Sequence, residues 1–262
     1  MELHLSTSEA REEPLWDQAA PRDVCRRCGA RRAGEFCSRC GQREARRLSL
    51  RRTFGETLEH VASLDSALLR TLIGLSTRPG TTIRRYIAGD RSGLASPAKY
   101  AFLAATLYAL VINLFEIDVR PAGARSGGAE AEGWMRLIVS LLAYLIFLYL
   151  LPAAAVLRLC YRRYGPNFAE SYVTLLYFAG QYLLAATFLA ALGTFSLDAG
   201  FWIVRGVGCL ILLWILAELF RASIARTILT TVAVYLLVVL GGMVAGVLTL
   251  LLSFLVPAIR PG

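Results

Sequence analysis

Apolar residues dominate the second half of the chain, in runs too long for the interior of a water-soluble protein. Residues 227–259 contain no charged side chain, whereas about 20 apolar residues are enough for a helix to cross roughly 30 Å of bilayer hydrocarbon. Lipid offers no hydrogen-bond partners, so the backbone of such a run must pair its own N–H and C=O groups, as a helix does. The pattern therefore predicts an all-α polytopic membrane domain over residues 98–257.

Gly, Pro and charged residues divide this domain into about five transmembrane helices, over residues 99–117, 135–157, 171–192, 201–220 and 227–256. Cytoplasmic loops of membrane proteins are enriched in Lys and Arg. The loops after the second and fourth helices carry five arginines: Arg158, Arg162, Arg163, Arg221 and Arg226. Residues 1–24 lack the apolar core of a signal peptide. We therefore expect a multi-pass protein with its N-terminus in the cytoplasm.

An amphipathic pattern precedes the membrane domain. From residue 50 to residue 75 apolar residues recur every three or four positions, the spacing of one face of an α-helix. The opposite face is charged, which is typical of a helix that lies in the membrane surface or packs on a helical bundle. Residues 43–97 are thus predicted to form a basic helical segment at the membrane surface. Six of its arginines are expected to contact lipid headgroups: Arg46, Arg47, Arg51, Arg52, Arg84 and Arg85.

Turn residues mark where this amphipathic helix ends and a shorter one follows. Pro79 and Gly80 terminate the first helix, because neither residue continues a helix well. Thr81 is expected to cap a second, short helix through its hydroxyl group. Gly89 then closes this helix, and Pro97 precedes the first membrane crossing.

Two CxxC pairs separated by eight residues stand before this segment: Cys25, Cys28, Cys37 and Cys40. A glycine follows the second cysteine of each pair and allows the tight turn that metal knuckles require. Four thiolates at this spacing are the ligand set of one tetrahedral Zn²⁺. In a reducing compartment such cysteines are metal ligands more often than disulfides. Residues 25–42 are thus predicted to form a structural zinc ribbon behind a disordered tail over residues 1–24; free or redox-cycling thiols are the alternative.

Charge adds information about partners. The chain carries a net charge of +9, and residues 22–52 hold eleven arginines against three acidic residues. Such a segment is attracted to anionic lipid. Phe36 is the only aromatic residue in the same stretch, so the stacking platform of a nucleic-acid-binding module is missing, which argues against nucleic acid as a partner.

Several of these motifs together resemble a known family. In order they are Phe36-Cys37-Ser38-Arg39-Cys40-Gly41-Gln42, then Leu64-Asp65, Leu69-Arg70-Thr71-Leu72, Arg78-Pro79-Gly80, Ile83-Arg84, Tyr86, Gly89, Arg91, Ser96-Pro97 and Tyr100. The pattern is similar to bacterial membrane proteins that contain domain of unknown function 3667, over about residues 25–102. The resemblance implies a cytoplasmic zinc ribbon joined to a helical domain in the bacterial inner membrane. It implies no activity.

Polar groups within the predicted crossings are few. Gln181 lies near the centre of the third helix, where hydrogen bonding between helices is its expected role. Arg205 and Glu218 lie near the two ends of the fourth helix and are expected to snorkel to the membrane interfaces. Gly242 and Gly246 form a GxxxG motif, which lets helices approach closely. Packing within the chain and contact with a second copy are both open.

The sequence offers little for catalysis. Both histidines lie outside the predicted crossings, and Glu170 and Glu218 are the only candidate pair of carboxylates. We therefore expect a non-enzymatic interaction or lipid-sensing module with a structural zinc site. Its expected partners are membrane lipid, a cytoplasmic protein or a second copy of the chain. The alternative is a transporter or channel subunit, which is supported only by the multi-helix bundle and its Gly-rich helices.

Overall fold

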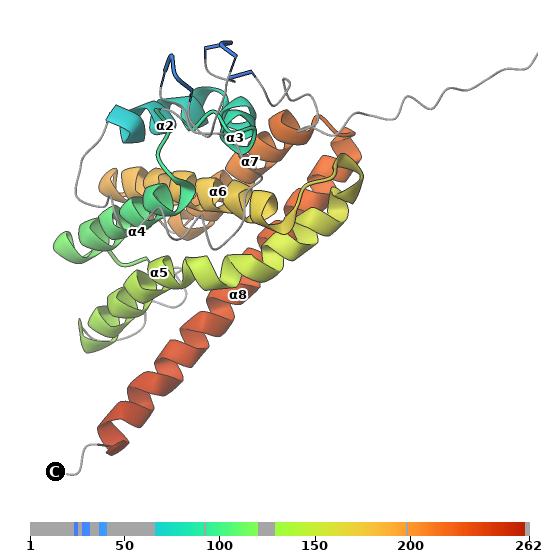
Figure 1. The fold of residues 1–262 in the computed structure, drawn as a ribbon. Helices are drawn as coiled ribbons and strands as arrows, with labels where there is room; N and C mark the ends of the chain where they lie inside the picture. The colour runs from blue at the N-terminus through green and yellow to red at the C-terminus, as the bar shows by residue number, and fades with distance from the viewer. Residues whose placement is uncertain are drawn as a thin grey trace, which may run out of the picture.

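The computed structural model describes residues 24–25, 28–31, 37–40, 66–91, 93–119, 129–197 and 199–259. Apart from one isolated β-bridge, regular structure in these residues is helical, which confirms the predicted all-α class. Two short 3₁₀ helices are η2 (Arg162–Tyr164) and η3 (Thr194–Ser196). The α-helices are α2 (Ser66–Thr77), α3 (Pro79–Ile87), α4 (Pro97–Leu114), α5 (Ala129–Cys160), α6 (Phe168–Ala191), α7 (Gly200–Phe220) and α8 (Ile224–Ile259) (Figure 1).

Some predictions lie outside the described residues. These are the disordered tail up to residue 23, the part of the amphipathic helix that precedes Ser66, and four of the arginines expected at lipid headgroups: Arg46, Arg47, Arg51 and Arg52.

Five helices of the described part are long and apolar enough to cross a membrane: Pro97–Leu114, Ile138–Cys160, Phe168–Ala191, Gly200–Phe220 and Ile224–Ala245. They confirm the predicted multi-pass architecture. Because consecutive spans alternate in direction, α4, α6 and α8 begin at the end of the bundle where α5 and α7 finish. α3 packs at this same end, against the last turn of α7. The loop arginines after α5 and α7 therefore share one side of the membrane domain with α3.

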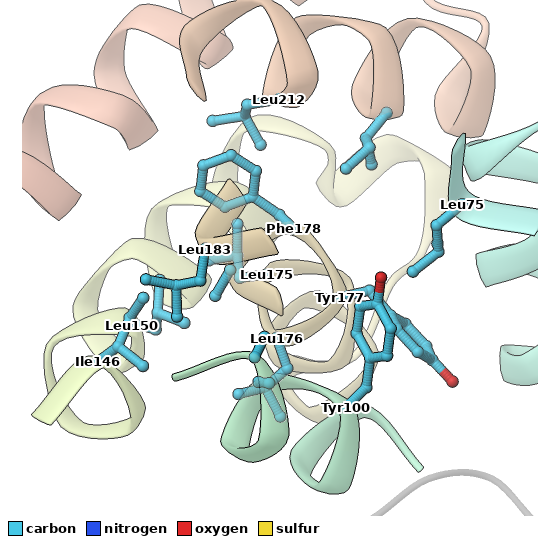
Figure 2. Close-up of a cluster of buried hydrophobic side chains, with 14 of the residues drawn as sticks. Leu75, Tyr100, Ile146, Leu150, Leu175, Leu176, Tyr177, Phe178, Leu183 and Leu212 are labelled. Atoms are coloured by element: carbon cyan, nitrogen blue, oxygen red, sulfur yellow. The ribbon is translucent and has the colours of Figure 1, made fainter. Parts of the chain in front are cut away.

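Helix α6 forms the centre of the bundle and contacts α4, α5 and α7. All of its residues from Ala169 to Gly180 are buried, which explains why it is apolar on every face. In Figure 2, Leu175, Leu176 and Phe178 point in different directions from α6, toward Leu212 of α7 and toward side chains of α4 and α5. The hydrophobic core of the bundle therefore surrounds α6.

Gly180 brings α4 and α6 unusually close. A Cβ atom at this position would overlap the ring of Tyr100 and lie 3.3 Å from the Cα of Ala101. Glycine inside a helix is less favourable than alanine by roughly 1 kcal/mol. The direct contact between the two helices offsets that loss, since small residues allow the close packing on which helix association in membranes depends.

Helix α8 is the longest and lies at the edge of the bundle, along α5 (Figure 1). Its 36 residues correspond to about 54 Å, more than the hydrocarbon thickness. The close approach to α5 occurs at Gly241, where a Cβ would lie 2.7 Å from the Cβ of Tyr149. At Gly242 a Cβ would meet no atom within 4 Å, so the tight contact is one residue earlier than the GxxxG motif suggests. The contacts of Gly246 lie outside the part of the chain whose side-chain surroundings the structure describes.

Helix α2 packs on the bundle rather than standing apart from it. Thr71 and Leu75 are buried against the core, and Leu68 and Leu72 are partly buried beside them. This face is the one that the apolar periodicity predicted. Of the two placements left open by the sequence, the membrane surface and the helical bundle, the packing of α2 corresponds to the second.

Candidate metal centre and its connection to the membrane domain

The four cysteines of the CxxC pairs converge on one point. Their Sγ atoms all lie within 4.8 Å of one another. The Sγ atoms of Cys25 and Cys40 are 3.5 Å apart, and those of Cys28 and Cys37 are 3.6 Å apart. These distances are far above the roughly 2.05 Å of a disulfide. They are close to the spacing of about 3.8 Å that four sulfurs take around a tetrahedral ion at 2.3 Å. The cluster could therefore hold one metal ion.

Local backbone geometry builds the first half of this cluster. The N–H of Gly29 donates to the carbonyl of Cys25 at 2.9 Å, and the N–H of Cys25 donates to the carbonyl of Ala30 at 2.8 Å. Gly29 adopts a φ of +72°, the left-handed conformation that glycine accepts without strain. An antiparallel bridge between Val24 and Arg31 closes the turn. The predicted role of the glycine after the CxxC pair is thus confirmed at Gly29.

In the second CxxC pair, backbone N–H groups lie next to a cysteine sulfur. The N–H groups of Arg39 and Cys40 donate to the Sγ of Cys37 and lower the pKa of this thiol. A lowered pKa favours the thiolate, which is the form that binds metal. Cys25 and Cys37 are buried, whereas Cys28 and Cys40 are half-buried. Arg31 and Arg39 are exposed beside the cluster, where their charges oppose the excess negative charge of four thiolates.

A carboxylate from α7 caps the start of α3. The side chain of Glu218 accepts hydrogen bonds from the N–H of Gly80 at 3.1 Å, the N–H of Thr81 at 3.0 Å and the hydroxyl of Thr81 at 2.6 Å. These N–H groups belong to the first turn, where a helix has no acceptors of its own and favours negative charge. Pro79 occupies the first helical position. The predicted cap by Thr81 was therefore wrong: Thr81 lies inside the helix, and the cap comes from α7.

Arg84 completes the connection in the opposite direction. Its Nη2 donates to the carbonyls of Glu218 at 2.6 Å and Leu219 at 3.0 Å, at the last turn of α7. Carbonyls at a helix C-terminus lack intrahelical partners and favour a cation. Each of the two helices thus caps the other, and we call this arrangement of Glu218 and Arg84 the clasp. Burial against α7 lowers the pKa of Arg84.

The clasp involves one of the arginines that were expected to contact lipid headgroups. Arg84 was expected at lipid headgroups, but its guanidinium points to α7 and is engaged there. Arg85 is exposed and forms an ion pair with Asp90 at 2.7 Å. Glu218 was expected to snorkel, and the structure instead gives its carboxylate three donors from α3. The need for a cap from elsewhere had a signal in the sequence, because the first turn of α3 has no acidic residue and no capping side chain of its own.

A second polar junction joins α2, α4 and α6. Gln181 accepts a hydrogen bond from the hydroxyl of Tyr100 at 2.6 Å and donates to the hydroxyl of Ser76 at 2.8 Å. The hydroxyl of Thr71 accepts from the N–H of Ala95 at 2.8 Å. Gln181 thus has a role in hydrogen bonding between helices, and both of its amide atoms are used.

The two candidate carboxylates are each engaged at the start of a helix. Glu170 is buried in a capping box, where its side chain accepts from the N–H of Asn167 at 2.8 Å. The hollow between Glu170 and Arg84 has a volume of about 10 Å³, the lower limit for a single water molecule. Glu170 and Glu218 therefore each cap a helix, and the hollow beside Glu170 is too small for an organic substrate.

Part of the chain is similar to a known protein family. No curated protein and no solved structure matches the chain. Residues 65–109 match the family described as Protein of unknown function (DUF3667). The match begins at α2 and ends within α4, so it contains α3, the Arg78-Pro79-Gly80 turn and the arginine of the clasp. It confirms, over this stretch, the family resemblance that the sequence motifs indicated.

Proposed function

We propose that this protein is a non-enzymatic module of the bacterial inner membrane. In this proposal a structural Zn²⁺ folds an arginine-rich cytoplasmic head. The head provides a platform for a protein partner or for anionic lipid, and the five-helix domain anchors it. The observation that carries the proposal is the convergence of four cysteine sulfurs within 4.8 Å. Four thiolates complete the tetrahedral shell of zinc, so the metal would keep no open position for a substrate or a reactive water.

Charge and attachment support a platform. The sequence places eleven arginines against three acidic residues between positions 22 and 52. Each cation close to an anionic membrane contributes about 1 kcal/mol of attraction. The helices that follow this segment, α2 and α3, are held to the bundle by the Gln181 junction and by the clasp. The head is therefore connected to an element that is fixed relative to the membrane domain.

Three polar groups of the spans give little support to the alternative of a transporter or channel subunit. Gln181 is engaged by Tyr100 and Ser76, and Glu218 by α3. Asn113 donates to the carbonyl of Ala109 and to the hydroxyl of Ser140, both at 2.7 Å. An ion pathway needs polar groups that are available to the ion, and these three are occupied by contacts within the chain.

The proposal predicts that the basic head responds to lipid charge. The full-length protein is placed in nanodiscs of neutral lipid or of lipid that includes an anionic component. Hydrogen exchange in residues 25–52 is expected to slow several-fold in the anionic discs. Replacing Arg46, Arg47, Arg51 and Arg52 by Gln should abolish the difference. The matched control replaces Arg162 and Arg163, which are exposed on η2, and should retain it.

A protein partner is tested in parallel with the same full-length chain as bait in cells. Proteins retained by the wild type but lost with Cys37→Ser would indicate recruitment through the folded head. The proposal fails if exchange is the same in both kinds of disc and if no protein distinguishes the wild type from Cys37→Ser.

A further inference from the structure

A partly open cavity of about 400 Å³ lies in the membrane domain between α5, α6 and α8, with one lining residue each from α4 and α7. Most of its wall is apolar and includes Ile146, Phe178 and Leu183, which Figure 2 shows near the core of the bundle. Arg205 and four tyrosines provide the polar part of the wall: Tyr108, Tyr149, Tyr182 and Tyr235. The volume falls within the range of about 300–1,000 Å³ that is typical of small-molecule sites.

Among the described residues that line this wall, Arg205 is the only charged one. It lies in the second turn of α7, about 7.5 Å along the axis from Gly200. Its guanidinium carbon is 5.2 Å from the centroid of the Phe201 ring. The hydroxyl of Tyr235, from α8, donates to the backbone carbonyl of Arg205 at 2.7 Å. Within the described part of the chain no carboxylate pairs with the Arg205 side chain.

Gly208 helps to assemble the polar wall. It lies one turn after Arg205 and is buried. A Cβ there would lie 2.7 Å from the Cε2 of Tyr182 and 3.0 Å from the hydroxyl of Tyr235. The glycine therefore lets side chains from α6 and α8 pack directly against α7 beside Arg205. Three helices thus meet around this one cation.

The unmatched charge points to the chemistry of a ligand. A guanidinium inside a membrane domain is costly unless an anion or suitable hydrogen-bond acceptors surround it. Tyrosine hydroxyls can accept hydrogen bonds but bring no negative charge. A carboxylate or phosphate fits the planar donor pattern of arginine and would neutralise it. The apolar remainder of the wall is suited to a hydrocarbon chain.

We propose that this cavity binds an anionic amphiphile with a single hydrocarbon chain, its headgroup paired with Arg205 and its chain lying on the apolar wall. Arg205 lies in the second turn of α7, and this helix begins at the end of the bundle opposite α3. Met243 and Val247 of α8 line the other part of the cavity and are 65% and 59% exposed. They border the region where lipid would surround the helix, so the hydrocarbon chain has a route from the bilayer. This proposal does not depend on the function proposed for the head.

Native mass spectrometry of the full-length protein in detergent tests the proposal. Four probes share one chain and differ in headgroup: hexadecanoate, hexadecyl phosphate, hexadecanol and hexadecyltrimethylammonium. We expect at least one of the two anions to bind at least about 10-fold more tightly than the alcohol or the ammonium compound, because charge-assisted hydrogen bonds are the stronger ones. The tighter anion identifies the headgroup class as carboxylate or phosphate.

Three variants locate the site. Arg205→Gln should weaken binding of the preferred anion about 10- to 100-fold and leave hexadecanol unchanged. Gly242→Leu should weaken every probe, because Gly242 lines the cavity and has open space around its Cα. Arg163→Gln, at an exposed arginine outside the cavity, should have no effect. The proposal is overturned if the wild type binds alcohol and both anions equally, or if Gly242→Leu leaves binding unchanged. Both of these results can be obtained even if the Arg205→Gln variant does not fold.

Discussion

Purified wild-type protein is expected to contain one zinc ion per chain, and Cys37→Ser almost none. Cys37 is buried, and its Sγ lies 3.6 Å from that of Cys28. A serine hydroxyl at this position stays protonated and is a poor zinc ligand. A segment of fewer than about 40 residues buries too little apolar surface to fold alone. Structural zinc supplies about 10 kcal/mol or more to such folds, so the ribbon should lose its structure together with the metal.

Metal analysis and limited proteolysis measure the two parts of this prediction. The matched control is Cys160→Ser, because Cys160 is an exposed cysteine at the end of α5. It should retain full zinc content and the wild-type cleavage pattern. Equal zinc content in Cys37→Ser and the wild type would contradict the assignment of Cys37 as a ligand. A metal-free wild type with a protease-resistant head would contradict a structural role for zinc.

Glu218→Ala is expected to release α3 from α7. The substitution removes an acceptor of three hydrogen bonds and a negative charge at a helix N-terminus. Hydrogen bonds to charged groups contribute about 1.5–3 kcal/mol in protected sites, and partial exposure of Glu218 lowers this figure. We therefore expect a loss of about 1–3 kcal/mol in the free energy that docks α3. Hydrogen exchange at Gly80 and Thr81 should become about 10- to 100-fold faster.

Two comparisons make this result specific. Glu218→Gln keeps an oxygen acceptor but no charge and should give an intermediate effect. Glu116→Gln changes an exposed carboxylate at the end of α4 and should leave the exchange of α3 unchanged. If Glu218→Ala leaves exchange at Gly80 and Thr81 as in the wild type, the clasp does not hold α3.

Features that depend on local spacing could be predicted from the sequence. The five spans follow from the length of the apolar runs, and the cysteine cluster follows from two CxxC pairs at a suitable distance. The buried face of α2, which includes Leu75, follows from helical periodicity. Each of these is a property of residues that are close together in the chain, and each follows from the geometry of a single element.

The partners in contacts between distant elements could not be predicted. Glu218 and Gly80 are separated by 138 positions, and nothing near Glu218 indicates that it caps another helix. Snorkelling was a reasonable expectation for a charge at the end of a span, but the N-terminus of α3 provides better partners than the membrane interface. Gly241 rather than Gly242 contacts α5 because the rotation of α8 is set by its neighbours.

The set of residues around the cavity could not be predicted from the sequence either. Its four tyrosines come from α4, α5, α6 and α8, and its arginine comes from α7. No spacing rule connects residues on five helices. In the sequence alone, Arg205 is a single arginine near the end of an apolar helix. The usual interpretation of such a residue is that its side chain snorkels to the membrane interface. The arrangement of the bundle then decides whether the guanidinium meets the interface or a hollow.

Reporter fusions test the central claim most directly, which is that five spans place an arginine-rich, zinc-folded head on the cytoplasmic side. We predict that a fluorescent reporter at the N-terminus, in the turn after Tyr164 or in the turn after Arg221 is active inside the cell. A phosphatase reporter after Leu197 or at the C-terminus should be active outside. An N-terminus outside the cell, or two termini on the same side of the membrane, would contradict the account.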